Sequence, residues 1–145
     1  MLTFADSPVL KLYALVASLL AVHMLLLALW TGTVRAMRKT FVNPEDAKLN
    51  KATQADQDHP DVLRVKRAHQ NAIENVLPFL AIGLVYALSG ASKTGAQAYF
   101  FTFLGARVLH SIFYLWGRQP FRTMMFALGV LCMFGMAFQV IRSAI

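Results

Sequence analysis

The chain has 145 residues, of which 57% are hydrophobic and only 14% are charged, and its mean hydropathy is +0.52. Soluble domains carry about a quarter of charged residues, so this composition excludes an ordinary soluble protein and indicates an integral membrane protein. The formal net charge is +7. Because most cations flank apolar runs or fall in one polar loop, this charge is typical of membrane topology and not of nucleic-acid binding.

Four apolar runs each approach the roughly 20 residues that cross the hydrocarbon core of a bilayer. Lipid offers the backbone no hydrogen-bond partner, so each run must be helical. We therefore expect an all-α bundle of four transmembrane helices, in a single membrane domain over 1–145. The predicted helices cover about 9–34, 61–90, 96–116 and 122–142, and a polar loop covers 35–60.

The cations of the connecting segments gather on one side of the predicted bundle. The segment 35–67 and the turn GRQPFR (117–122) hold Arg35, Arg38, Lys39, Lys48, Lys51, Arg64, Lys66, Arg67, Arg118 and Arg122. The opposite side has only Lys11, Lys93 and Arg142. The positive-inside rule therefore predicts that both basic loops are cytoplasmic and that both termini lie on the non-cytoplasmic side.

Two of the predicted helices carry polar stripes. Residues at spacings of three and four share one face of a helix. The stripe on the second helix consists of Arg64, Arg67, Gln70, Asn71 and Glu74, and the stripe on the third of Arg107, His110 and Tyr114, with Ser111 beside them. Charges inside a bilayer are costly unless they are paired, so the simplest arrangement pairs Glu74 with Arg107.

The stripes allow two interpretations. In the first, they hold the bundle together and have no further role. In the second, Arg35, Arg122 and Thr123 lie at the same helix ends and complete a polar cavity open to the cytoplasm. An excess of arginine suits an anionic ligand, because guanidinium groups bind carboxylates in a fork geometry. Glu74 and Asn71 would receive an ammonium or amide group, so a ligand with carboxylates, an amine and peptide bonds suits the cavity.

Other chemistries have no support in the sequence. The four histidines lack the spacing of a metal site, so no metal is expected. The lone cysteine, Cys132, lies in an apolar run and excludes an intramolecular disulfide. There is no phosphate-binding loop, dinucleotide fingerprint or serine-hydrolase motif.

Four segments together resemble the MAPEG family, the membrane-associated proteins of eicosanoid and glutathione metabolism. They are FVNPEDA (41–47), RAHQNAIENVLPFL (67–80), ARVLHSIFY (106–114) and QPFR (119–122). The resemblance covers nearly the whole chain. It implies a homotrimer embedded in lipid, with three glutathione sites at the subunit interfaces and a lipophilic substrate that arrives from the bilayer.

The resemblance also implies roles for individual residues. Glutathione contacts are implied for Arg67, Asn71, Glu74, Arg107, His110 and Tyr114, for the positions of Gln70 and Phe126, and for Arg35 reaching over from the neighbouring subunit. Catalytic roles are implied for Arg122 near the glutathione sulfur, for Thr123 beside it, and for Asp46 of the NPED segment. The sequence departs from the family's prostaglandin synthases at Gln70 (arginine there), Thr123 (serine) and Phe126 (tyrosine).

We therefore expect a glutathione transferase or peroxidase that activates glutathione as a thiolate for attack on lipophilic electrophiles or peroxides. Three alternatives stay open: a prostaglandin E synthase-like isomerase that depends on glutathione, a non-catalytic scaffold or lipid-binding protein, and an ion or proton transporter built around Glu74 and Arg107. The expected membrane is a bacterial inner membrane or the endoplasmic reticulum. No nucleic-acid partner is expected.

Overall fold

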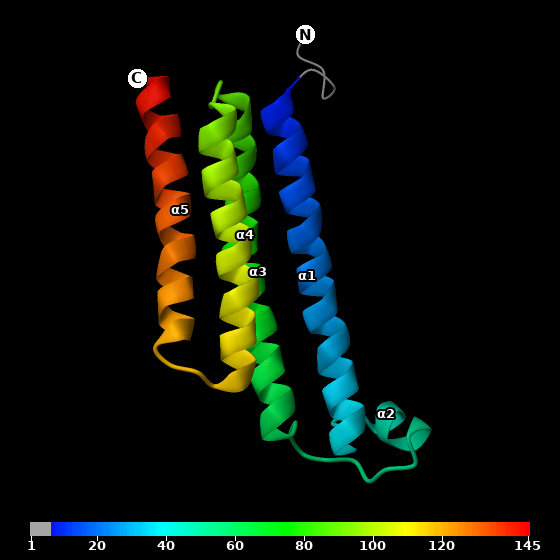
Figure 1. The fold of residues 1–145 in the computed structure, drawn as a ribbon. Coiled ribbons are helices and arrows are strands. Elements are labelled where there is room, and N and C mark those ends of the chain that lie inside the picture. Colours follow the sequence, from blue (N-terminus) through cyan, green and yellow to red (C-terminus); the bar gives the residue numbers. More distant parts are fainter. Residues whose placement is uncertain (1–6) are drawn as a thin grey trace.

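A computed structural model describes residues 7–145, so the first six residues of the predicted domain lie outside the description. Its helices are α1 (Pro8–Arg38), α2 (Pro44–Leu49), α3 (Pro60–Leu88), α4 (Lys93–Trp116) and α5 (Phe121–Ala144) (Figure 1). All except the short α2 are long and apolar enough to cross a membrane. The prediction of an all-α bundle with four spanning helices is confirmed, and α2 interrupts the segment predicted as a loop over 35–60.

Local sequence explains where the helices begin and end. Proline occupies the start of α1, α2 and α3, where its missing N–H is not needed. The Ser92 hydroxyl caps α4 by accepting from the backbone N–H of Gly95 at 3.1 Å. Gly117 ends α4 in the left-handed region, at φ 67°, which glycine adopts without a Cβ clash.

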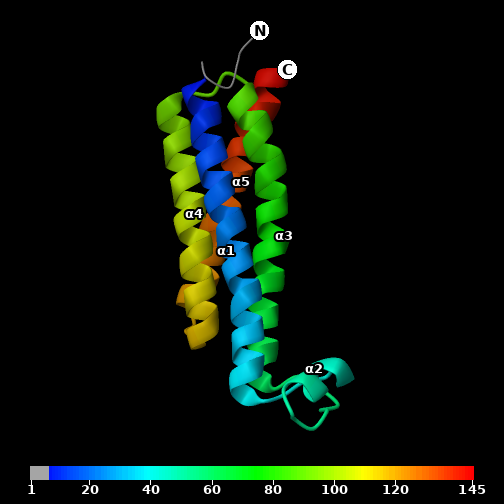
Figure 2. The same cartoon turned by 90° about the vertical axis from the view of Figure 1, so that its right-hand side faces the viewer.

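The spanning helices are not arranged equivalently. Helices α3 and α4 contact each other and also contact both α1 and α5, whereas α1 and α5 do not touch within residues 7–145. The pair α3–α4 therefore forms the middle of the bundle, with α1 on one flank and α5 on the other (Figures 1 and 2). Helix α2 and the α4–α5 turn lie at the same end, which we call the basic end because both basic loops are there.

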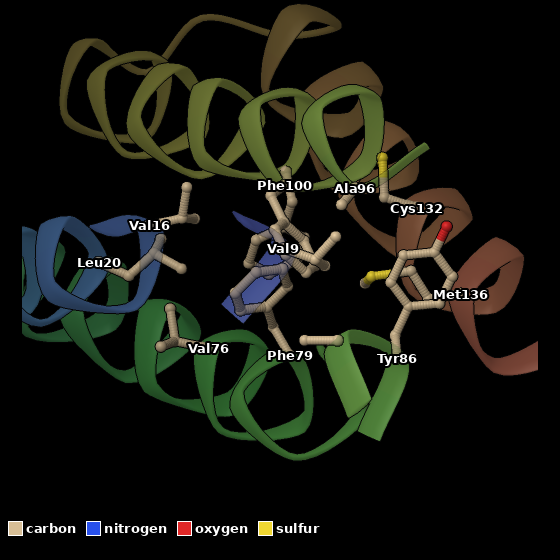
Figure 3. Packing of buried hydrophobic residues seen from close by; sticks show 12 residues of the cluster. Val9, Val16, Leu20, Val76, Phe79, Tyr86, Ala96, Phe100, Cys132 and Met136 are labelled. Carbon is tan, nitrogen blue, oxygen red and sulfur yellow. The ribbon is translucent and has the colours of Figure 1, made fainter. Parts of the chain in front are cut away.

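The apolar core lies mainly in the half of the bundle away from the basic end. Figure 3 shows how its side chains pack between the helices. The Phe79 and Phe103 rings stack with their centroids 4.2 Å apart, and Phe100 meets Phe79 edge-on at 5.6 Å. Large apolar side chains such as Leu29 and Phe134 point outward and are 68% exposed. That outward apolar surface is what a bilayer would cover, and the half near the basic end is left for polar side chains.

Candidate functional site

A polar pocket of about 220 Å³ opens on the α5 flank near the basic end. Its lining consists of Asn71 from α3, His110 and Tyr114 from α4, and Arg122, Thr123 and Phe126 from α5. His110 and Tyr114 are four residues apart on α4, and Arg122 and Phe126 are four apart on α5, so each of these pairs lies on one helix face. The structure thus brings together six of the residues singled out in the sequence, from three different helices.

Two neighbours hold the Arg122 guanidinium. Its central carbon lies 4.7 Å from the centre of the Tyr114 ring, a cation–π contact. The side-chain amide of Gln119 lies between Arg122 and Thr123. When the Gln119 amide is oriented so that both neighbours are hydrogen-bonded, its oxygen accepts from Arg122 Nε at 3.2 Å and its nitrogen donates to Thr123 Oγ1 at 2.9 Å.

Sequence reasoning missed Gln119. It precedes Arg122 by three residues and Thr123 by four, but it lies in the turn before α5, so helical spacing gave no signal for its role. Arg122 and Thr123 also lie in the first turn of α5, where the positive end of the helix dipole favours an anion. This end of the pocket therefore presents a positioned cation and a hydroxyl to a negatively charged atom.

Arg107 lies buried beside the pocket, only 1% exposed. Its Nη2 donates to the carbonyl oxygen of Met125 at 2.9 Å, and the guanidinium packs 5.7 Å from the centres of the Phe103 and Phe126 rings. Gly129 makes this possible, because a Cβ there would lie 2.8 Å from Arg107 Nη2.

The predicted pairing of Glu74 with Arg107 is wrong within this chain. Glu74 is exposed, and its Oε1 accepts from Gln70 Nε2 at 3.0 Å. The physical reason is that the small Gly129 lets Arg107 reach backbone carbonyls of α5. Those carbonyls replace a carboxylate as the acceptor.

Some polar atoms in this region are buried without a partner. Within residues 7–145, Asn71 Oδ1, Arg107 Nε and Arg107 Nη1 have no hydrogen-bond partner. A buried unpaired polar atom costs about 1–3 kcal/mol, so proteins rarely retain one without a reason. Asn71 lines the pocket, and its oxygen is an acceptor available to an N–H group of a ligand.

The other predicted residues of α3 lie outside the pocket lining. Arg67, Gln70 and Glu74 are exposed, and Arg67 and Glu74 share a helix face with Asn71. They form no ion pair with any residue of the described chain. A strip of polar side chains thus borders the pocket on α3, and we call Arg67, Gln70 and Glu74 the α3 strip.

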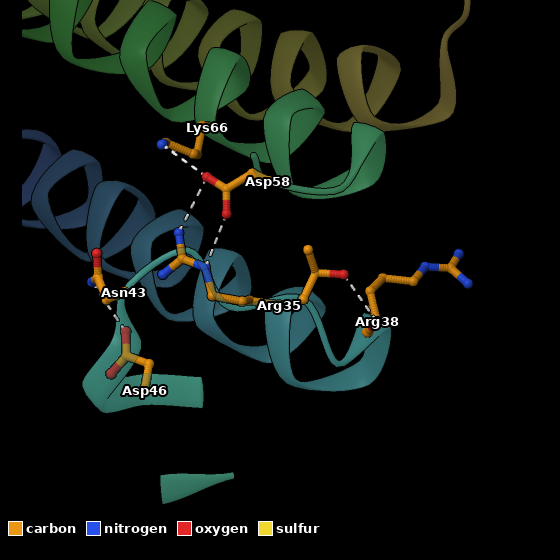
Figure 4. A network of polar contacts seen from close by, with 7 residues as sticks. Arg35, Arg38, Asn43, Asp46, Asp58 and Lys66 are labelled. Atoms are coloured by element: carbon orange, nitrogen blue, oxygen red, sulfur yellow. Dashed lines mark hydrogen bonds and ion pairs between the residues drawn. The ribbon is translucent and has the colours of Figure 1, made fainter. Parts of the chain in front are cut away.

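Arg35 and Asp46 do not line this pocket in their own chain. Arg35 donates from Nε (3.2 Å) and Nη2 (3.4 Å) to the buried carboxylate of Asp58, which also accepts from Lys66 Nζ at 3.1 Å (Figure 4). Asp46, in α2, accepts from Asn43 Nδ2 at 3.1 Å. Burial alone would raise the pKa of Asp58, but the hydrogen bonds from Lys66 and Arg35 outweigh burial and lower it.

Residues 7–145 contain no group of three or more histidine, cysteine, aspartate or glutamate side chains placed to hold a metal ion. The polar pocket is instead built from an arginine, two hydroxyl-bearing residues, an amide and a histidine.

Comparison with known proteins agrees with the resemblance seen in the sequence. Prostaglandin E synthase of Homo sapiens is 39% identical over 140 residues, which cover 96% of this chain and 92% of that protein. Prostaglandin E synthase of Macaca fascicularis is also 39% identical over 140 residues, with the same coverage. Microsomal glutathione S-transferase 1 of Homo sapiens is 38% identical over 143 residues, which cover 95% of this chain and 92% of that protein. The profile of the MAPEG family matches residues 13–142, and the chain belongs to this family of membrane proteins.

Proposed function

We propose that this chain is a membrane-bound glutathione transferase in which Arg122 stabilises the thiolate of glutathione. The observation that carries the proposal is the Arg122 guanidinium, held over Tyr114 and beside Thr123 in the polar pocket. Relatives named glutathione S-transferase and prostaglandin E synthase, at 36–39% identity over nearly the whole chain, support the reaction class.

Glutathione has two carboxylates, an ammonium group, two peptide bonds and a thiol, and the residues present offer a partner to each kind of group. Asn71 Oδ1 is an acceptor for a peptide N–H, and its lack of a partner among residues 7–145 supports this assignment. In the α3 strip, Arg67 suits a carboxylate and Glu74 suits the ammonium group. His110 and Tyr114 supply further donors inside the pocket.

The residues around the sulfur would activate it. A free thiol with a pKa of about 8.5 is mostly protonated at neutral pH. Arg122 favours the anion, and each unit by which the thiol pKa falls corresponds to about 1.4 kcal/mol. With the Gln119 amide oriented to donate to Thr123 Oγ1, the Thr123 proton is free to be donated to the sulfur. In transfer, the sulfur electron pair forms the new bond to the electrophilic carbon, and the leaving group departs with the electrons of the broken bond.

A lipophilic co-substrate has a place next to this pocket. An apolar pocket of about 260 Å³ lies along the same α3–α5 groove, lined by Pro78 and Ile82 of α3 and by Val130, Met133, Phe134 and Ala137 of α5. Val130 is one helical turn, about 6 Å, deeper than Phe126 of the polar pocket. This proximity supports a reaction between a polar thiol from the aqueous side and an electrophile or peroxide from the bilayer.

The assembly and orientation that we propose are a homotrimer with its sites facing the cytoplasm. Each site would be completed by Arg35 and Asp46 of the neighbouring subunit. Arg35 uses Nε and Nη2 for Asp58, so its Nη1 stays available for a glutathione carboxylate. The cations concentrated at the basic end support the cytoplasmic orientation.

A second candidate is a glutathione-dependent endoperoxide isomerase. The identity to human prostaglandin E synthase, 39% against 38% for the human transferase, favours keeping it. It uses the same thiolate, so incubation with a lipid endoperoxide and analysis of the product separates it from the transferase.

The test is a titration of the purified protein with glutathione, followed by the ultraviolet absorbance of the thiolate. Wild type is expected to bind glutathione and to ionise it at neutral pH, and Arg122→Ala to lose the thiolate absorbance. Arg118→Ala is the matched control, because Arg118 belongs to the same turn but does not line the pocket. Absence of glutathione binding, or an unchanged thiolate absorbance in Arg122→Ala, would contradict the proposal. A panel of small electrophiles and peroxides then identifies the preferred reaction.

A further inference from the structure

A third pocket, of about 350 Å³, lies at the basic end on the opposite flank from the polar pocket. Trp30 and Arg38 of α1, Asp61 and Arg64 of α3 and Trp116 of α4 contribute to its lining. Because α1 and α5 lie on opposite sides of the α3–α4 pair, this α1-flank pocket shares no residue with the proposed glutathione site.

Arg64 was expected on the stripe with Arg67 and Asn71, but it lines the α1-flank pocket instead. Its hydrogen bond, from Nη1 to the backbone oxygen of Leu115, is long at 3.5 Å, so most of its donors stay free. Gly117 leaves room for the guanidinium, since a Cβ there would lie 3.4 Å from Nη1. Arg64 therefore presents a positive charge to the pocket at the carbonyl end of α4.

The charges in the α1-flank pocket do not cancel. Arg38 Nη2 lies 2.6 Å from Asp61 Oδ2, and this pair stays partly exposed, with side chains 53% and 41% accessible. Asp61 neutralises one guanidinium, and Arg64 has no carboxylate partner among residues 7–145. The pocket therefore favours an anion, and the arginine fork suits phosphate oxygens in particular.

The rim of this pocket carries two exposed tryptophans, the residue type found where lipid meets water. Trp30 is 46% exposed and Trp116 is 69% exposed, and tryptophan concentrates at the boundary between lipid and water. Exposed apolar side chains continue from this rim toward the bilayer centre: Leu26 lies one turn before Trp30, and Leu109 two turns before Trp116. These side chains form a track along which an acyl chain can lie.

We infer that the α1-flank pocket binds an anionic phospholipid, with Arg64 and Arg38 at the headgroup phosphate and the acyl chains along α1 and α4. A soluble anion would make no use of the exposed apolar track. A choline headgroup would place a further cation beside the two arginines, so an anionic headgroup is preferred to a zwitterionic one.

Intrinsic fluorescence tests this inference without a label, because the chain has two tryptophans and both line the pocket. The protein is reconstituted into vesicles of phosphatidylglycerol and phosphatidylcholine, with the bromine quencher placed on one lipid and then on the other. Wild type is expected to show about fivefold preferential quenching by brominated phosphatidylglycerol, the effect of one cation at a membrane surface.

The matched variants are Arg64→Gln and Arg142→Gln, the second at the opposite end of the bundle. Arg64→Gln is expected to abolish the lipid preference, and Arg142→Gln to retain it. Glutathione titration, which reports on the other flank, shows whether the Arg64→Gln protein is folded. Equal quenching by both lipids in wild type would overturn the inference. So would a preference retained in folded Arg64→Gln, or relief of quenching by millimolar inorganic phosphate.

Discussion

At the scale of single residues, the missing side chain of Gly129 determines where Arg107 lies. A Cβ at Gly129 would lie 2.8 Å from Arg107 Nη2 and 3.0 Å from its Nε. The guanidinium has little room to move, because it is 1% exposed and bonded to the carbonyl oxygen of Met125. We predict that Gly129→Ala lowers the free energy of unfolding by about 1–3 kcal/mol, the usual cost of overpacking. Thermal unfolding in detergent measures the change.

The control for Gly129→Ala is Gly105→Ala on α4, the helix that carries Arg107. A Cβ at Gly105 would have no other atom within 4 Å. Both substitutions remove a helical glycine and gain the same helix propensity, about 1 kcal/mol at most. The difference in the free energy of unfolding between the two variants therefore measures the cost of the clash with Arg107. Equal stability of the two proteins would show that Arg107 moves without cost.

Thr123 allows a residue-scale test of the proposed thiolate activation. Replacement by valine keeps the shape and removes the hydroxyl that Gln119 orients. A hydrogen bond to a charged group contributes about 1.5–3 kcal/mol, so Thr123→Val is expected to lower kcat/KM by roughly 10- to 100-fold. Thr123→Ser retains the hydroxyl and should stay near the wild-type rate. Conjugation of glutathione to a small electrophile gives the measurement, and a fully active valine variant would exclude Thr123 from the chemistry.

Helical periodicity was sufficient to single out the pocket residues of α3 and α4. Asn71 follows Arg67 by four residues on α3, and Tyr114 follows His110 by four on α4. It was not sufficient for the partner of Arg107. That partner is a backbone carbonyl, which every residue has, so no sequence pattern marks it. The role of Gln119 was hidden for a related reason, since it depends on how the turn before α5 folds back on Arg122 and Thr123.

At the scale of helices, Asp58 ties the basic loop to both α1 and α3. Its side chain is 6% exposed and accepts from Arg35 and Lys66, which are themselves 26% and 51% exposed. Removing one member of a buried ion pair is costly, but exposure of the partners screens part of the effect. We predict that Asp58→Asn costs about 1–3 kcal/mol of stability, whereas Asp56→Asn, an exposed neighbour in the same loop, costs little. Equal unfolding temperatures of the two variants would contradict this.

The same carboxylate predicts a pH dependence. The folded pKa of Asp58 is lowered below its ordinary value of about 3.9, so its contribution to stability is complete above that pH. The contribution is lost as the pH falls below about 4 and through the folded pKa. Wild type is therefore expected to lose more stability than Asp58→Asn over that interval. Parallel stability curves for the two proteins would show that Asp58 does not contribute.

The spanning helices could be predicted because lipid leaves no alternative to helix, so the length of an apolar run sets the element. Helix α2 is short and polar, so the length of an apolar run could not predict it. Its sequence nevertheless carries a helix-start signal, with proline at the first position and Glu45 and Asp46 in the first turn.

At the scale of the whole molecule, the α3 strip is the surface that most needs a partner from outside the chain. Glu74 is exposed on a helix long enough to span the membrane, and its side-chain partner in the chain is the uncharged Gln70. A carboxylate facing lipid is costly, so this surface needs a protein or ligand partner. The sequence of one chain contains the polar strip but not the partner, which is why the number of subunits rests on family resemblance alone.

Complementation between inactive chains tests the proposed sharing of sites. If Arg35 of one subunit and Arg122 of its neighbour complete one site, chains carrying Arg35→Ala or Arg122→Ala are each inactive alone. In randomly mixed trimers, about a quarter of the interfaces pair the intact Arg122 of one chain with the intact Arg35 of the other, as a head-to-tail ring requires. We therefore predict recovery of up to about a quarter of wild-type activity on co-expression, with native mass spectrometry giving three times the 16.1 kDa chain mass.

A mixture of Arg122→Ala with Thr123→Val chains is the control, since both changes lie in one half of the site and cannot complement. If the mixed Arg35 and Arg122 variants stay as inactive as either parent, while the trimer forms, each site belongs to a single chain.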